Sequence, residues 1–224
     1  QENIRLLSDI MHQEGASLSV LIDVDVGLKR CGLPYDQPES IASLARYIQN
    51  QELSFAGIMC HAGQAYQCRN TEEVAKVGLF EGTVMAELAE KLRKQGMPCP
   101  TVSVGSTPTA RYAGTVAGIT ELRCGTYLFN DAMQVALGMV DYSSCALRVV
   151  STVISVPDKG RAIIDAGSKT LALDRGAHGT EGVQGFGYVV GRKAALVKLS
   201  EEHGFLETQE PFAVGEKVEI IPNH

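Results

Sequence analysis

The sequence contains no cluster of lysine or arginine and no long hydrophobic run. Its net charge of −6 and the lack of a basic patch argue against a nucleic-acid partner, which needs cations to neutralise phosphates. The longest apolar stretches, such as 18–22 and 194–199, are far shorter than the roughly 20 residues that cross a bilayer. Residues 1–15 have helical apolar spacing but no cationic start or cleavage site, which argues against a signal peptide. We therefore expect no nucleic-acid partner and no membrane insertion.

Paired cysteine motifs are also missing. Six cysteines are scattered along 224 residues without any CxxC spacing, so the pattern indicates neither a zinc knuckle nor a disulfide scaffold. Reduced thiols and a cytoplasmic location fit this pattern best.

Between residues 17 and 131 the sequence alternates short apolar runs with helical patterns. A helix is predicted over 38–50, where Ile41, Leu44 and Ile48 share one face, and a long helix is predicted over 71–96. The predicted strands are 18–25, 55–63, 100–110 and one within 119–131. Four βα units are half of an eightfold parallel barrel. The fold class is therefore α/β, and we assign residues 1–136 to the C-terminal half of a (β/α)8 TIM-like barrel.

Long helical patterns cease after residue 137. Apolar runs separated by glycine and charged turns predict strands at 146–157, 160–168, 185–191, 194–200 and 216–222. Residues 137–224 are therefore predicted to form a mostly antiparallel β domain. The first helix has no strand before it and the last strand has no closing element after it, so we expect the chain to be part of a longer protein.

Candidate site residues lie where the predicted parallel strands end, because active sites of α/β folds form at that edge. Gly105 permits a close backbone approach, and the hydroxyls of Ser106 and Thr107 could hold an oxyanion, although an ordinary turn explains the same residues. Arg30 follows Asp23 and Asp25 on the first strand. It could clamp an anionic oxygen or form a salt bridge with these carboxylates.

Other polar residues offer acid, base or metal chemistry. His61 could be a general base and Tyr66 an acid or hydrogen-bond donor, although a structural histidine is the alternative. Lys169 could form a Schiff base or a surface salt bridge. A divalent metal could be ligated by Glu202, His203 and His224.

Taken in order, a series of segments resembles the D-threonine aldolase and D-serine dehydratase family. The segments are LIDVDVGLKRCG, FAGIMCHAGQAY, VSVGSTPT, ELRCGTYLFND, IIDAGSKTLALD, SEEHG and VGEKVEIIPNH. The resemblance spans essentially the whole chain and implies the alanine-racemase-like barrel of fold type III pyridoxal phosphate enzymes, followed by a β domain. It also implies which residues contact that cofactor. Its phosphate would be held by Ser106, Thr107 and the backbone of Gly125 and Thr126. Tyr66 would flank the ring, Arg30 would face the phenolic oxygen and Arg123 would approach the ring nitrogen.

The resemblance further implies a divalent metal, zinc or manganese, near the C-terminus. His224 matches the histidine of the family's His-x-Cys or His-x-Asp pair, and His203 lies in a motif that lines the site. The family's Schiff-base lysine lies in a motif like RPHxKTHK, which has no counterpart here, and neither Lys29 nor Lys169 matches it. We therefore expect this chain alone to be inactive.

The implied activity of the intact protein is a lyase reaction on D-3-hydroxy amino acids. A metal bound to the substrate's 3-hydroxyl would assist either dehydration or retro-aldol cleavage, and the VGSTPT form of the turn is closer to the dehydratases. The implied partners are a small D-amino acid and a second copy of the chain in a homodimer. Two alternatives stay open: an amino-acid racemase, favoured by Arg123, and a non-catalytic fragment, favoured by the missing lysine.

Overall fold

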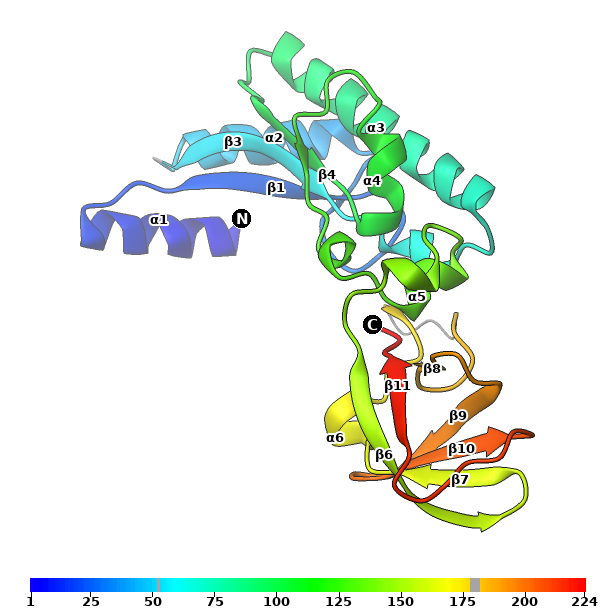
Figure 1. Ribbon diagram of the computed structural model, residues 1–224. Helices are drawn as coiled ribbons and strands as arrows, with labels where there is room; N and C mark the ends of the chain where they lie inside the picture. The colour runs from blue at the N-terminus through cyan, green and yellow to red at the C-terminus, as the bar shows by residue number, and fades with distance from the viewer. Residues whose placement is uncertain (52, 178–181) are drawn as a thin grey trace. The chain divides into compact units, whose positions relative to one another are not determined.

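The computed structural model of the protein describes residues 1–51, 53–177 and 182–224. These residues form two compact units, and Figure 1 labels most of their elements. The first unit comprises Gln1–Ala65 and Glu72–Gly125, and the second comprises Tyr66–Thr71 and Thr126–His224. The domain boundary after residue 136 stays a prediction.

The first unit contains an open sheet of five parallel strands in the order β2-β1-β3-β4-β5. The strands are β1 (Ser19–Asp25), β2 (Leu33–Pro34), β3 (Ser54–Cys60), β4 (Thr101–Val104) and β5 (Glu121–Leu122). Parallel neighbours need crossover connections, and helices supply most of them here. The predicted parallel α/β architecture is confirmed, whereas the two-residue strand β2 was not predicted from the sequence.

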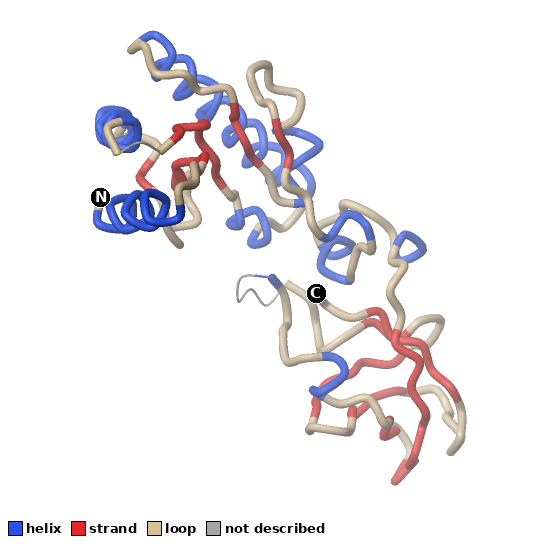
Figure 2. Tube along the Cα trace, turned by 90° about the vertical axis from the view of Figure 1, so that its left-hand side faces the viewer, coloured by secondary structure: helices blue, strands red, loops and turns tan. Residues whose placement is uncertain are grey.

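Helices of the first unit follow the apolar periodicity of the sequence. They are α1 (Glu2–Glu14), α2 (Pro38–Gln49), α3 (Thr71–Lys94) and α4 (Thr107–Ala113). Helix α2 begins at Pro38, whose fixed φ suits a first helical turn, and it buries Ile41, Ala45 and Ile48 in the same core as the strand residue Ile58. Figure 2 shows these helices flanking the strands.

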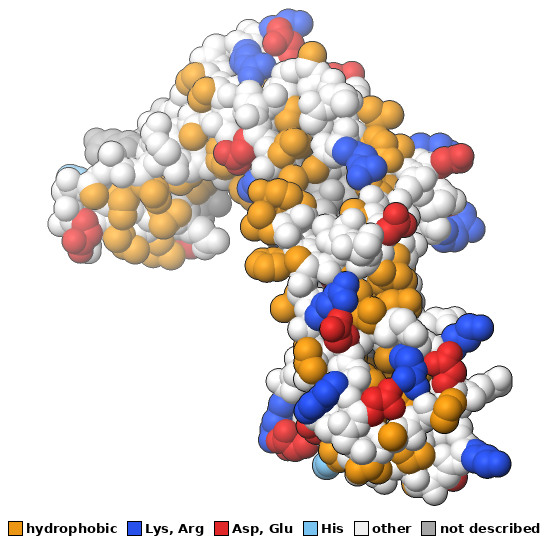
Figure 3. All heavy atoms as spheres, viewed as in Figure 1, with side chains coloured by type: hydrophobic (Ala, Val, Ile, Leu, Met, Phe, Trp, Pro, Cys, Tyr) orange, Lys and Arg blue, Asp and Glu red, His pale blue; other side chains and the backbone are white. Residues whose placement is uncertain are grey.

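Helix α1 has a largely exposed apolar face. Ile4 and Met11 pack against the core of the sheet, but Leu6, Leu7 and Ile10 are 47, 37 and 48 % exposed. Figure 3 shows the resulting hydrophobic patch on this helix. Only half of the apolar face expected from the sequence is therefore used for packing. In the part of the chain that the structure describes, no helix combines the length and apolarity needed to span a bilayer.

The second unit is built on a closed antiparallel barrel with the strand order β10-β7-β6-β11-β8-β9. Its strands are β6 (Val149–Asp158), β7 (Arg161–Ile164), β8 (Tyr188–Val189), β9 (Ala194–Leu199), β10 (Gly204–Thr208) and β11 (Lys217–Ile221). Val153, Ile164, Leu196, Leu206 and Ile220 fill the interior. The predicted antiparallel β domain is confirmed, and closure removes the unpaired edges of an open sheet.

Short helical elements complete the two units. They are the 3-10 helices η1 (Gly63–Gln67), η2 (Thr126–Leu128) and η3 (Tyr142–Ser144) and the α-helices α5 (Ala132–Ala136) and α6 (Ser168–Leu171). Helix α5 is the best anchored of them, because the side chain of Asp131 accepts a hydrogen bond from Gln134 N at 2.8 Å as its N-cap.

The pairing of β3 with β4 depends on Gly57. Its φ is +139°, and a Cβ at this position would lie 1.9 Å from the carbonyl oxygen of Thr101. We predict that Gly57→Ala lowers the free energy of unfolding of the first unit by about 3 kcal/mol, because backbone atoms must shift to admit the methyl group. Urea unfolding would measure this loss. The control is Gly125→Ala, where a Cβ meets nothing within 4 Å; equal stability of the two variants would contradict the prediction.

Candidate active site

Polar side chains of the first unit gather where the parallel strands end. His61 directly follows β3 and Gly105 directly follows β4. The ring nitrogen Nδ1 of His61 lies 3.1 Å from the carbonyl oxygen of Gly105. A carbonyl only accepts, so Nδ1 carries the proton in this contact. The structure therefore brings two predicted site residues into contact.

The turn after β4 buries the hydroxyl of Thr107, for which the described residues provide no hydrogen-bond partner. Ser106 and Thr109 form a capping box, with Ser106 N donating to Thr109 Oγ1 at 3.3 Å and the two hydroxyl oxygens 3.1 Å apart. Thr107 Oγ1 is buried, and among the residues that the structure describes it has no hydrogen-bond partner. A buried hydroxyl without a partner is costly. This turn is therefore suited to a ligand that accepts a hydrogen bond.

Arg123, which follows β5, is held by the ends of two other strands. Its Nη2 donates to the carbonyl oxygen of Cys60 at 2.5 Å, and its Nη1 donates to Ser103 Oγ. Ser103 in turn donates to a carboxylate oxygen of Glu121. The guanidinium is thus a fixed positive charge at the carboxyl edge of the sheet. The neighbouring Gly125 is the last residue of the first unit.

Arg30 does not form the salt bridge with Asp23 or Asp25 that was one of the two interpretations of the sequence. Asp25 Oδ1 accepts hydrogen bonds from Gly27 N at 2.8 Å and Lys29 N at 3.0 Å, and so stabilises the turn after β1. Across the described ranges of the chain, no ion pair joins Arg30 to Asp23 or Asp25. Arg30 is exposed and shares the lining of a small hollow with these two carboxylates and His61. The salt-bridge interpretation of this motif is therefore wrong, and the clamp interpretation stays a prediction.

In the second unit Tyr66, Gln134, Asp131 and His224 form one cluster. Gln134 Nε2 donates to the Tyr66 hydroxyl at 3.5 Å, and the rings of Tyr66 and His224 meet edge to face with centroids 6.0 Å apart. His224 Nδ1 lies 2.8 Å from Oδ2 of the buried Asp131. That hydrogen bond raises the pKa of His224 above its usual value, against the opposing effect of burial. The sequence did not single out Asp131 or Gln134, because both lie far along the chain from the residues they contact.

The suggested trio of Glu202, His203 and His224 does not form. Lys169 Nζ lies 2.7 Å from Glu202 and 3.1 Å from Glu201, so these exposed side chains make surface ion pairs. His203 is exposed in the turn between β9 and β10. Within residues 1–51, 53–177 and 182–224, no three His, Cys, Asp or Glu side chains gather as a metal site. The Schiff-base role considered for Lys169 is equally unsupported, and the metal role of His224 stays a prediction.

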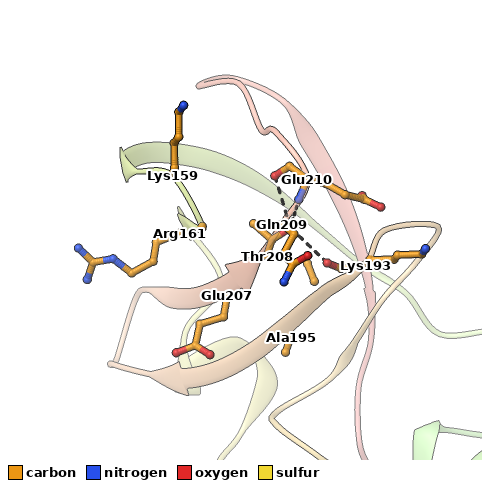
Figure 4. Close-up of a pocket in the computed structure, with 10 residues that line it drawn as sticks. Lys159, Arg161, Lys193, Ala195, Glu207, Thr208, Gln209 and Glu210 are labelled. Carbon is orange, nitrogen blue, oxygen red and sulfur yellow. Dashed lines mark hydrogen bonds between the residues drawn. The ribbon is translucent and has the colours of Figure 1, made fainter.

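A broad hollow lies on the barrel of the second unit. Figure 4 shows it between the β6–β7 and β9–β10 hairpins, with Lys159, Arg161 and Lys193 pointing outward and Glu207 on the same wall. Thr208 Oγ1 bonds the backbone of Lys193 and Glu210, so the loop is closed by its own hydrogen bonds. None of the predicted site residues lines this hollow.

Two family models together match most of the chain. The model described as alanine racemase, N-terminal domain, matches residues 1–132, and the model described as putative serine dehydratase domain matches residues 146–224. Similar curated proteins include D-threo-3-hydroxyaspartate dehydratase of Delftia sp. (strain HT23), 32 % identical over 95 % of this chain and 60 % of that protein. Another is D-threonine aldolase of Arthrobacter sp., 31 % identical over 99 % of this chain and 58 % of that protein.

Solved structures agree with these matches. The D-threo-3-hydroxyaspartate dehydratase from Delftia sp. HT23 superposes with a TM-score of 0.90 at 32 % identity, covering 99 % of this chain and 62 % of that one. A cysteine-to-alanine mutant of a D-threo-3-hydroxyaspartate dehydratase in the metal-free form gives 0.91 at 31 % identity, covering all of this chain and 63 % of that one. An alanine racemase of Clostridium difficile 630 shares the fold alone, with a TM-score of 0.60 at 14 % identity over 60 % of its length.

The chain thus spans about 60 % of the length of the curated relatives it matches. The fold that contains its parallel sheet and its antiparallel barrel superposes on that of the solved dehydratase. The chain therefore belongs to the alanine racemase-like family of the D-threonine aldolases and D-serine dehydratases.

Proposed function

We propose that the protein containing this chain is a pyridoxal phosphate-dependent lyase that acts on D-3-hydroxy amino acids. The observation that carries the proposal is the turn at Ser106 and Thr107, at the carboxyl edge of a parallel sheet, where a buried hydroxyl has no hydrogen-bond partner among the described residues. The relatives at 31 to 32 % identity are named as dehydratase and aldolase of such amino acids. Similarity to alanine racemases is lower and supports only the shared fold, so the racemase alternative is the weaker one.

The residues of the chain fit the cofactor at the position of its phosphate. Thr107 Oγ1 needs an acceptor, and a phosphate oxygen is a strong one. In this proposal Ser106, Gly125 and Thr126 complete the phosphate site. Arg123 approaches the ring nitrogen, Arg30 faces the phenolic oxygen and Tyr66 flanks the ring.

The bound cofactor would supply an electron sink for the bond broken at the substrate's Cα. The chain's own residues would then bind, orient and move protons. Arg123 is fixed by Cys60 and Ser103, so it holds its position without losing further side-chain entropy on binding. His61 is oriented by the hydrogen bond between its Nδ1 and the Gly105 carbonyl, at the edge where the substrate would bind.

For the metal, the chain offers one oriented ligand. Asp131 engages His224 Nδ1, which leaves Nε2 as the ligating nitrogen in the arrangement common for metal-bound histidines. The described residues do not assemble three ligands by themselves, so the metal identity, zinc or manganese, stays a prediction. A cytoplasmic location and a homodimeric state of the intact protein are likewise predictions.

We predict that the full-length protein releases a 2-oxo acid and ammonia from D-serine or D-threo-3-hydroxyaspartate. The reason is the dehydratase-like form of the turn at 104–109. A coupled assay for the oxo acid and a parallel assay for glycine and acetaldehyde from D-threonine separate dehydratase from aldolase. Racemisation without either set of products would overturn the proposal.

We predict that Thr107→Val weakens binding of pyridoxal phosphate by roughly tenfold, because a buried hydrogen bond to the phosphate is lost. Absorbance titration measures the affinity, and pyridoxal serves as the ligand without a phosphate. Thr83→Val, at an exposed position on α3, is the matched control. An unchanged affinity of Thr107→Val would remove this hydroxyl from the phosphate site.

We predict that Asp131→Asn lowers the pKa of His224 towards the value of a free histidine, about 6.5. The folded-state pKa is raised, so the stability gained from the pair is complete below the unfolded pKa and is lost as the pH rises through the folded value. NMR titration of the His224 ring in the presence of a chelator measures the change. Asp141→Asn, at an exposed position, should leave this pKa unaltered.

A further inference from the structure

Glu81 is a fully buried carboxylate that contacts the turn at Ser106 and Thr107 from behind. It lies in α3 and is 0 % exposed. Its Oε1 accepts hydrogen bonds from Gly105 N at 3.0 Å and from Cys60 Sγ at 3.4 Å. Its Oε2 accepts from Thr109 Oγ1 at 2.8 Å. One side chain thus fixes both ends of the turn.

Two glycines allow α3 to come close enough for this contact. A Cβ on Gly78 would lie 2.9 Å from the Thr109 carbonyl oxygen, and a Cβ on Gly82 would lie 3.0 Å from the Ala113 carbonyl oxygen. Both glycines therefore face the backbone of α4 at close range. Glu81 lies between them in sequence, at the place where the two helices touch.

The charge of Glu81 makes its hydrogen bonds hard to give up. Among the described residues, no lysine, arginine or histidine forms an ion pair with it. A buried carboxylate without a cation depends on its hydrogen-bond donors. Burial above all raises the pKa of the Cys60 thiol, so this donor keeps its proton. The turn is therefore held in place by the cost of leaving the carboxylate unpaired.

The hydrogen bonds also set the direction of each hydroxyl proton in the turn. Thr109 has one hydroxyl proton, and it points to Glu81. The contact between the Ser106 and Thr109 hydroxyls then uses the proton of Ser106. Thr107 is left with a hydroxyl proton that has no acceptor among the residues the structure describes.

We propose that Glu81 is a positioning residue for the cofactor's phosphate group. It orders the turn so that the Thr107 hydroxyl, and not that of Thr109, is directed to the ligand. This role rests on the proposed function, because it presupposes that a phosphate ester binds the turn.

The test compares Glu81→Leu, Glu81→Gln and Met85→Ala in binding pyridoxine 5′-phosphate, which cannot react with lysines. Glu81→Leu removes the acceptor of Gly105 N and of the Thr109 hydroxyl proton and should weaken binding roughly tenfold or more. Glu81→Gln can accept from Gly105 and donate to Thr109, so it should lose less than about threefold. Met85→Ala removes a buried side chain one turn along the same helix and should retain the affinity while losing stability.

A second readout is independent of the ligand. The NMR resonance of the Gly105 amide proton should move upfield in Glu81→Leu and stay near its wild-type position in Met85→Ala, because only the first variant removes its acceptor. Wild-type affinity in Glu81→Leu, or an equal loss in Met85→Ala, would overturn the positioning role alone. A wild-type protein that does not bind pyridoxine 5′-phosphate would instead overturn the proposed function and, with it, this role.

Discussion

The register of the parallel sheet is the constraint on which the candidate site depends. Gly57 of β3 lies opposite Thr101 of β4 at a distance that no side chain at position 57 would allow. This register sets where β3 and β4 end relative to each other. It thereby brings His61 to the carbonyl of Gly105 and lets Arg123 reach the carbonyl of Cys60. A shift of one residue would move each of these side chains to the opposite face of the sheet.

Each unit uses a buried carboxylate in the same way. Asp131 accepts from a backbone amide through Oδ1 and holds His224 through Oδ2. Glu81 accepts from the amide of Gly105 through Oε1 and from the Thr109 hydroxyl through Oε2. In both cases one oxygen anchors the backbone and the other orients a side chain. These bonds couple the position of a side chain to the stability of the local backbone.

Local patterns in the sequence predict the helices and strands better than they predict the side-chain contacts of the candidate site. The strands and helices follow from apolar periodicity, and the missed strands are β2, with two residues, and β10, a five-residue segment with little pattern. The strand-end rule finds His61, Ser106 and Arg123 because chain direction alone places them at one edge. It does not find Glu81, which lies in the middle of a helix, or Asp131, which contacts a histidine 93 residues away. Similarly, the hydrogen-bond donors to Asp25 are backbone amides of a turn, which the sequence pattern does not indicate. The pattern instead suggested Arg30 as the partner of this carboxylate.

The charges around Cys60 explain how a buried acid can lie beside the proposed phosphate site. Glu81 accepts from the Cys60 thiol while Arg123 donates to the Cys60 carbonyl, so opposite charges are anchored to one residue. Their effects on the thiol oppose each other, since Glu81 raises its pKa and Arg123 lowers it. Glu81 is fully buried and its oxygens are occupied by donors, whereas Arg123 is only partly buried. An incoming phosphate would therefore meet the neutral donors of the turn and the field of Arg123, while the negative charge that orders the turn stays behind it.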